Sequence, residues 1–273
     1  MPAKHLLLDS ELPLSRAQRT LVAAAVLTPA FPIASSAQEA DPMITDRPDF
    51  TESASTIVPG RFQFEVGYTF TKAGSEERHN FGELLARVGI LSWLEGRLGL
   101  NSFSQIRSPS AERSGLEDVT VSFKALLYRK PDVSSAAVPQ VALLFGADLP
   151  TGEGSFGEDE LQPGGRVALD FELGERFNIG SNVGWAYLQS DGERFHQGVG
   201  SLVLGYALSA DVTAFVEGYG FFPENRGGGS NYYVNGGFAW HLSAGFQLDW
   251  KIGLGLQDPD PTWFTGFGVS FRL

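Results

Sequence analysis

The sequence of 273 residues lacks cysteine altogether and has only two methionines and four histidines. The absence of cysteine excludes a disulfide framework and thiolate metal sites. No run of eighteen apolar residues occurs either, so the chain cannot cross a membrane as a helix. Membrane strands remain compatible with this sequence, because their signal is alternation and not a long apolar run.

The chain also has few basic residues relative to acidic ones. The chain carries 20 lysines and arginines against 32 aspartates and glutamates, which gives a formal net charge of −12. Binding of nucleic-acid phosphates needs a basic surface. We therefore expect no nucleic-acid partner.

The few histidines do not suggest a reactive site. Downstream of residue 37 they are His79, His196 and His241, which are far apart in the sequence. Ser243 lies near His241, but no acid that would orient the imidazole is evident. Metal ligands occur in groups with characteristic spacings, which these histidines lack. We expect no catalytic residue, no metal and no cofactor, and hence a protein that is not an enzyme.

What the chain has instead is alternation, together with 33 glycines and 15 prolines that suit strands and turns. In "RFQFEVGYTF" (61–70) large apolar side chains alternate with Gln63, Glu65, Gly67 and Thr69. A period of two residues is typical of a strand with two unlike faces. The pattern recurs to the last residue, Leu273. It predicts about twelve strands of roughly ten residues, the length that a tilted membrane strand needs.

The connections between these strands are of two kinds. Tight ones are expected at 91–93, 174–176, 209–211 and 243–245, and 129–139 is a longer exception to them. Long polar connections, rich in glycine and acidic residues, are expected at 72–80, 103–115, 150–164, 188–197, 222–231 and 257–261. Tight turns at one rim and long loops at the other are the arrangement of outer-membrane barrels.

Charged residues share the parity opposite to the large apolar residues. A soluble sandwich would show the same alternation, with its polar face in water. The strand lengths, the unequal rims and aromatic residues near strand ends, such as Trp93 and Trp240, favour the membrane. We predict an all-β fold, a transmembrane antiparallel up-and-down β-barrel of about 12 strands.

The chain divides into three parts. Arg16 and Arg19 precede an apolar stretch that ends in small residues, with Ser35 and Ala37 placed as at a signal-peptidase site, so residues 1–37 are expected to be a signal peptide. Residues 38–60 form a polar segment that lies either in the periplasm or in the lumen as a plug. Residues 61–273 are the expected barrel, whose C-terminal "GFGVSFRL" resembles the signal by which barrel assembly machinery engages the last strand.

Several segments resemble the outer-membrane family named after the MetA-pathway of phenol degradation. They run in order from "ITDRPDFTES" (44–53) and "PGRFQFEVGYTF" (59–70) through "LEDVTVSFKALL" (116–127) to the C-terminal 247–273. The more specific pieces are the tetrapeptide 46–49 and the turn 149–152. The resemblance implies an outer-membrane channel that admits aromatic or other hydrophobic compounds, and it brings no catalytic residues.

The expected function is passive uptake of small molecules, hydrophobic or aromatic ones among them, across the bacterial outer membrane. The expected partners are outer-membrane lipid and lipopolysaccharide, the assembly machinery and a small-molecule solute. A structural or adhesive barrel, or a secreted soluble binding protein, would be the alternatives. Candidate plug residues are Asp46, Arg47 and Asp49. Candidate residues that line the lumen are Glu65, Glu83, Arg87, Glu95, Arg97, Lys124, Asp170, Glu172, Asp249 and Lys251.

Overall fold

A computed structural model describes residues 43–131, 138–190, 192–257 and 262–273. The expected signal peptide at 1–37 and the first residues of the polar segment, 38–42, lie outside the described residues. The strands are β1 (Phe62–Ala73), β2 (Glu76–Phe81), β3 (Leu84–Leu91), β4 (Leu94–Leu100), β5 (Phe103–Ser108), β6 (Ala111–Leu116), β7 (Val119–Tyr128), β8 (Gln140–Leu149), β9 (Gln162–Leu173), β10 (Phe177–Ser190), β11 (Glu193–Ala207), β12 (Val212–Phe222), β13 (Asn231–Ser243), β14 (Phe246–Gly255) and β15 (Thr262–Arg272).

These strands form one antiparallel sheet that closes on itself. Neighbours along the chain pair throughout β7 to β15, and β15 pairs with β1, with Gly67 opposite Gly268. Three of the strands continue others in the wall: β2 follows on from β3, β5 from β4, and β6 from β7. The wall therefore has twelve strands, as predicted. Closure pairs both edges of the wall at the β15–β1 seam, whereas β6, in the β5–β6 hairpin, pairs with β5 alone among the described strands.

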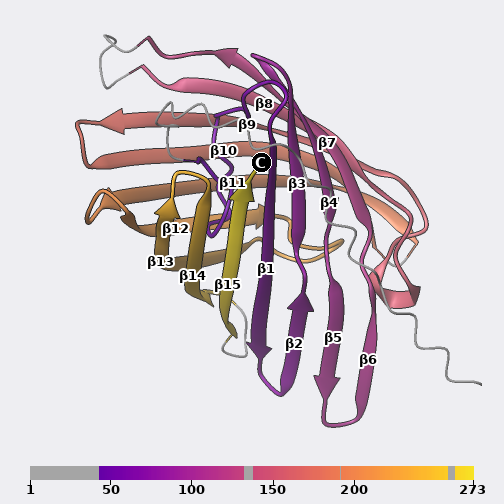
Figure 1. Cartoon of the computed structure of the whole chain (residues 1–273). Coiled ribbons are helices and arrows are strands. Elements are labelled where there is room, and N and C mark those ends of the chain that lie inside the picture. The colour runs from indigo at the N-terminus through magenta and orange to yellow at the C-terminus, as the bar shows by residue number, and fades with distance from the viewer. Residues whose placement is uncertain (1–42, 132–137, 191, 258–261) are drawn as a thin grey trace, which may run out of the picture. The chain divides into compact units, whose positions relative to one another are not determined.

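The rim at which long loops were expected differs from the sequence prediction. The stretches 72–80 and 103–115, expected as loops, are instead largely strand: they form the β1–β2 and β5–β6 hairpins, which project at the bottom of Figure 1. The expected loop at 188–197 is likewise mostly strand, since β10 ends at Ser190 and β11 begins at Glu193. The barrel wall is thus taller on this side than the apolar pattern indicates.

The two faces of the wall are opposite in character to those of a soluble barrel. Large apolar side chains such as Val183, Leu202 and Phe267 point outward and are more than half exposed. Charged and amide side chains are buried inside, and Arg87 and Lys124 are among the largest of the fully buried ones. Outward aromatics lie near strand ends, including Trp93 and Trp240, each half exposed. The described part of the chain contains no helix long and apolar enough to span a membrane.

Candidate functional site in the barrel lumen

The lumen is occupied by the first described stretch of the chain, residues 43–60, which we call the N-terminal segment. It enters at the rim of tight turns, where the Met43 amide donates to the carbonyl of Ala244 (2.9 Å). It returns to the same rim, where the Gly60 amide donates to the carbonyl of Gly89 (2.9 Å), and continues into β1. Figure 1 shows this irregular stretch inside the ring of strands. The segment is therefore a loop that enters and leaves the lumen at the same rim.

An irregular backbone inside a barrel needs partners for its amides, because a buried amide without one is costly. Acidic and amide side chains from the wall supply them. Glu65 accepts from the Asp46 amide (3.0 Å), and Glu217 accepts from the amides of Phe50 (2.9 Å) and Thr51 (2.7 Å). Further wall acceptors are Asn182 for Glu52 (2.8 Å), Asp170 for Ala54 (2.8 Å) and Glu95 for Ile57 (2.8 Å).

Asp46 is the centre of a buried charge cluster. Its carboxylate lies 2.6 Å from Arg97 Nη1, 2.9 Å from Lys124 Nζ and 3.1 Å from Arg87 Nη1. The same cations pair with acids of the wall and of the segment: Arg87 with Glu65 and Glu95, and Arg97 with Glu95 and Glu52. Burial opposes the charge of Asp46, yet Arg87, Lys124 and Arg97 together hold its pKa well below the ordinary value.

Arg47 crosses the seam at which the barrel closes. Its guanidinium pairs with Glu83 (3.0 Å) and Asp249 (3.5 Å) and donates to the carbonyl of Phe267 on β15 (3.1 Å). Space for it comes from the facing glycines of the β1–β15 pair. A Cβ on Gly67 would lie 2.1 Å from Arg47 Nη1, and one on Gly268 would lie 2.3 Å from Arg47 Nε. The two glycines therefore form a slot for the arginine.

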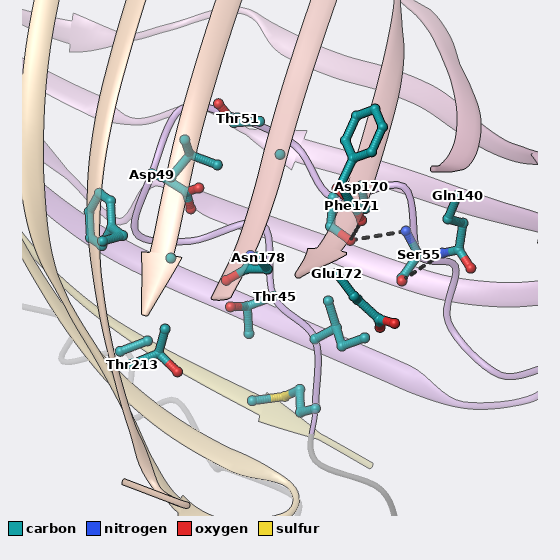
Figure 2. Close-up of a pocket in the computed structure, with 18 of the residues that line it drawn as sticks. Thr45, Asp49, Thr51, Ser55, Gln140, Asp170, Phe171, Glu172, Asn178 and Thr213 are labelled. Carbon is teal, nitrogen blue, oxygen red and sulfur yellow. Dashed lines mark hydrogen bonds between the residues drawn. The ribbon is translucent and has the colours of Figure 1, made fainter. Parts of the chain in front are cut away.

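Asp49 differs from its neighbours because no basic group lies within ion-pair distance of it among the described residues. Burial and the nearby carboxylate of Glu217 raise its pKa well above the ordinary value. Asp49 faces a cavity of about 550 Å³ toward the rim of tight turns, together with Asp170, Glu172 and Asn178. Figure 2 shows these side chains around the segment, with the Gln140 side-chain amide donating a hydrogen bond to the hydroxyl of Ser55.

A second cavity lies on the other side of the segment. It has a volume of about 190 Å³ and is lined by Glu52, Arg97, Asp148 and Arg166, with Gly146, Gly164 and Gly184 among its wall residues. Adjacent small residues keep this part of the lumen free of side chains. The N-terminal segment and its charge cluster thus separate two spaces within one barrel.

The structure brings most of the predicted lumen residues together. Glu65, Arg87, Glu95, Arg97 and Lys124 surround Asp46, and Glu83 and Asp249 hold Arg47.

Three predicted residues lie apart from these clusters. Asp170 binds the amide of Ala54 and the hydroxyl of Ser53. Lys251 lies on the inward face of β14 and takes part in no ion pair within the described chain. Glu172 is at the mouth of the larger cavity, with its side chain 76% exposed and Lys130 at 3.4 Å.

Sequence reasoning missed the inward aromatic wall of β12 and β13. The ring of Phe50, from the segment, stacks on Tyr219 with centroids 4.4 Å apart and meets Phe221 edge-on at 5.5 Å. Tyr219 stacks in turn on Tyr233 at 5.0 Å. The one available signal was in the sequence "VTAFVEGYGF", where Phe215 and Tyr219 share the parity of Glu217. That shared parity marks aromatics that point inward with the acid.

Comparison with known proteins agrees with this architecture. Residues 45–273 match the family described as "Putative MetA-pathway of phenol degradation". An outer membrane channel from Pseudomonas putida F1 is 14% identical, with a TM-score of 0.65 over 81% of this chain and 98% of that one. The NanC porin is 12% identical, with a TM-score of 0.54 over 77% of this chain and 100% of that one. A search of curated proteins gives no match.

Proposed function

Because the chain belongs to this family of the MetA-pathway of phenol degradation and forms a transmembrane barrel, we propose that it is a channel of the bacterial outer membrane. It admits small molecules passively, including hydrophobic or aromatic ones, and catalyses no reaction. The rim of tight turns faces the periplasm. Lipid and lipopolysaccharide surround the apolar exterior, and the last strand, β15, is the element that the assembly machinery engages.

The observation that carries this proposal is the lumen itself. Two cavities are separated by a segment that is held by hydrogen bonds and ion pairs and has no strand pairing of its own beyond a single bridge at Pro59. A solid structural barrel would fill this space with wall side chains. Here the filler is a loop whose displacement would join the two cavities. The segment therefore acts as a plug, and opening requires its movement.

Single-channel recording of the refolded mature chain tests the proposal. The parent mature protein should give rare openings, because the N-terminal segment fills the lumen. Replacing Arg97 by glutamine leaves Asp46, Glu52 and Glu95 with one cation fewer, so the segment should loosen and openings should become several-fold more frequent.

Arg107 provides the matched control. It carries the same charge on β5, but its side chain is 51% exposed, so Arg107→Gln should conduct as the parent does. If folded, inserted protein with Arg97→Gln conducted no more than bare lipid, the channel proposal would be wrong and a structural or adhesive role would be favoured. Protein that stayed soluble without detergent would favour a secreted binding protein.

The pH should act on the plug in two opposite ways. Asp49 has a raised pKa, so the docked segment takes up a proton at a higher pH than the released one, and mild acidification favours docking. Asp46 has a lowered pKa, so docking weakens once the pH falls below the ordinary carboxyl value of about 3.9. We expect open probability to be lowest at mildly acidic pH and to rise again in stronger acid. Single-channel recordings from neutral to strongly acidic pH check this dependence. Asp49→Asn should abolish only the fall in open probability at mildly acidic pH.

A further inference from the structure

The ring of Phe50 occupies a defined site in the lumen wall. Tyr219 covers one face, with an interplanar angle of 15°, and Phe221 meets the ring edge-on. The guanidinium carbon of Arg166 lies over the ring, 5.2 Å from its centroid. Aromatic stacking and a cation over a ring face are interactions that any single aromatic ring of similar size can make. The site therefore recognises a ring and not the phenylalanine backbone.

The site adjoins the smaller cavity at Arg166. Arg166 belongs both to the ring site and to the lining of the 190 Å³ space, and within the described chain no carboxylate lies at ion-pair distance from its guanidinium. A cavity of about 150 Å³ is large enough to hold benzene. A small aromatic solute that enters the smaller cavity thus reaches Arg166, the side chain that also contacts the ring of Phe50.

The ring site is also the place where the segment is anchored to β12. The amides of Phe50 and Thr51 and the hydroxyl of Thr51 all donate to Glu217, which precedes Tyr219 on the same inward face. A molecule that competes for the ring site acts on the segment where its backbone is held. Aliphatic molecules of equal size lack the ring faces that Tyr219 and Arg166 contact.

We propose that the space between Tyr219 and Arg166 is an exchangeable binding site for an aromatic ring, in which Phe50 is the resident occupant. A solute ring that takes this place releases the N-terminal segment and so opens its own path. This inference rests on the proposed channel function, and it adds to that function a site and a means of opening.

The test is single-channel recording of the full mature chain with toluene, and with methylcyclohexane as the non-aromatic probe of similar size. Toluene should raise the open probability of the parent protein about tenfold, the scale of one lost aromatic contact, and methylcyclohexane should not. Without solute, the open probability of Phe50→Ala should exceed that of the parent by a similar factor, and toluene should not raise it further. Tyr219→Leu keeps the apolar bulk and should lose the response to toluene.

Phe238→Ala is the matched control, since Phe238 is also a stacked phenylalanine, facing outward against Trp250. It should respond to toluene as the parent does. An equal response to both solvents, or a full toluene response in Phe50→Ala, would overturn the ring site while leaving the channel intact. Absence of conductance in every variant, with insertion demonstrated, would instead refute the channel function on which the inference rests.

Discussion

Replacing Asp46 by asparagine is expected to open the channel more than any other single change in the segment. Asparagine keeps the shape of the side chain but removes the charge that Arg87, Arg97 and Lys124 share, all at 3.1 Å or less. Loss of one partner from a buried ion pair typically costs about 3–5 kcal/mol, because the remaining charges stay buried without compensation. Releasing the segment lets water reach those cations, so the cost falls on the docked state. Open probability should rise by two orders of magnitude or more.

Asp49 provides the matched control for this experiment. Asp49→Asn is the same chemical change three residues along, at a carboxyl whose pKa is raised and not lowered. Its neutralisation removes a repulsion from Glu217, so docking at neutral pH should be unchanged or tighter. Recordings of both variants under one set of conditions decide the matter. Equal opening by the two, or a closed Asp46→Asn channel, would contradict the central position given to Asp46.

Replacing Gly268 by alanine is expected to destabilise the barrel seam strongly. The new Cβ would lie 2.3 Å from Arg47 Nε and 2.5 Å from the carboxylate of Asp249, so both cannot stay where they are. Expulsion of Arg47 leaves Asp249 buried without its cation, at a cost of about 3–5 kcal/mol. The midpoint of denaturant unfolding in detergent should fall accordingly, and openings should become more frequent.

Gly218→Ala is the control for this substitution. Gly218 lies within β12, and a Cβ there would meet nothing closer than the carbonyl oxygen of Tyr233 at 3.9 Å. The unfolding midpoint should stay close to that of the parent or rise slightly, since alanine restricts the unfolded chain. If Gly268→Ala matched Gly218→Ala in stability, the slot would have no energetic role.

The sequence was sufficient to predict the barrel, its twelve strands and the inward charges, because a period of two with one lipid-facing side repeats within the apolar belt of the wall. It missed β2, β5 and β6 for a physical reason. Segments such as "EERHNF" lie beyond the apolar belt, where the outward face no longer has to be apolar and the alternation disappears. Backbone pairing continues there without the pattern that reveals it.

The partners across the lumen could not be predicted. That Arg47 meets Asp249, or that Phe50 meets Tyr219, depends on strand register and on the path of an irregular loop, neither of which is encoded by periodicity. Gly268 is a particular case. In the sequence it is one position of a stretch that resembles a C-terminal assembly signal, whereas in the structure its missing side chain makes room for Arg47. The resemblance gave no indication of this second role.

Both ends of the N-terminal segment lie at the same rim, and the second end runs directly into β1. The plug is therefore a tethered ligand, present at a fixed effective concentration that reaches the millimolar range for short flexible links. It cannot be diluted away or lost, and its rebinding does not depend on how much protein the membrane contains. In the proposed mechanism, closure follows each opening as an intramolecular event, so a bound solute competes with a segment that is always present beside its site.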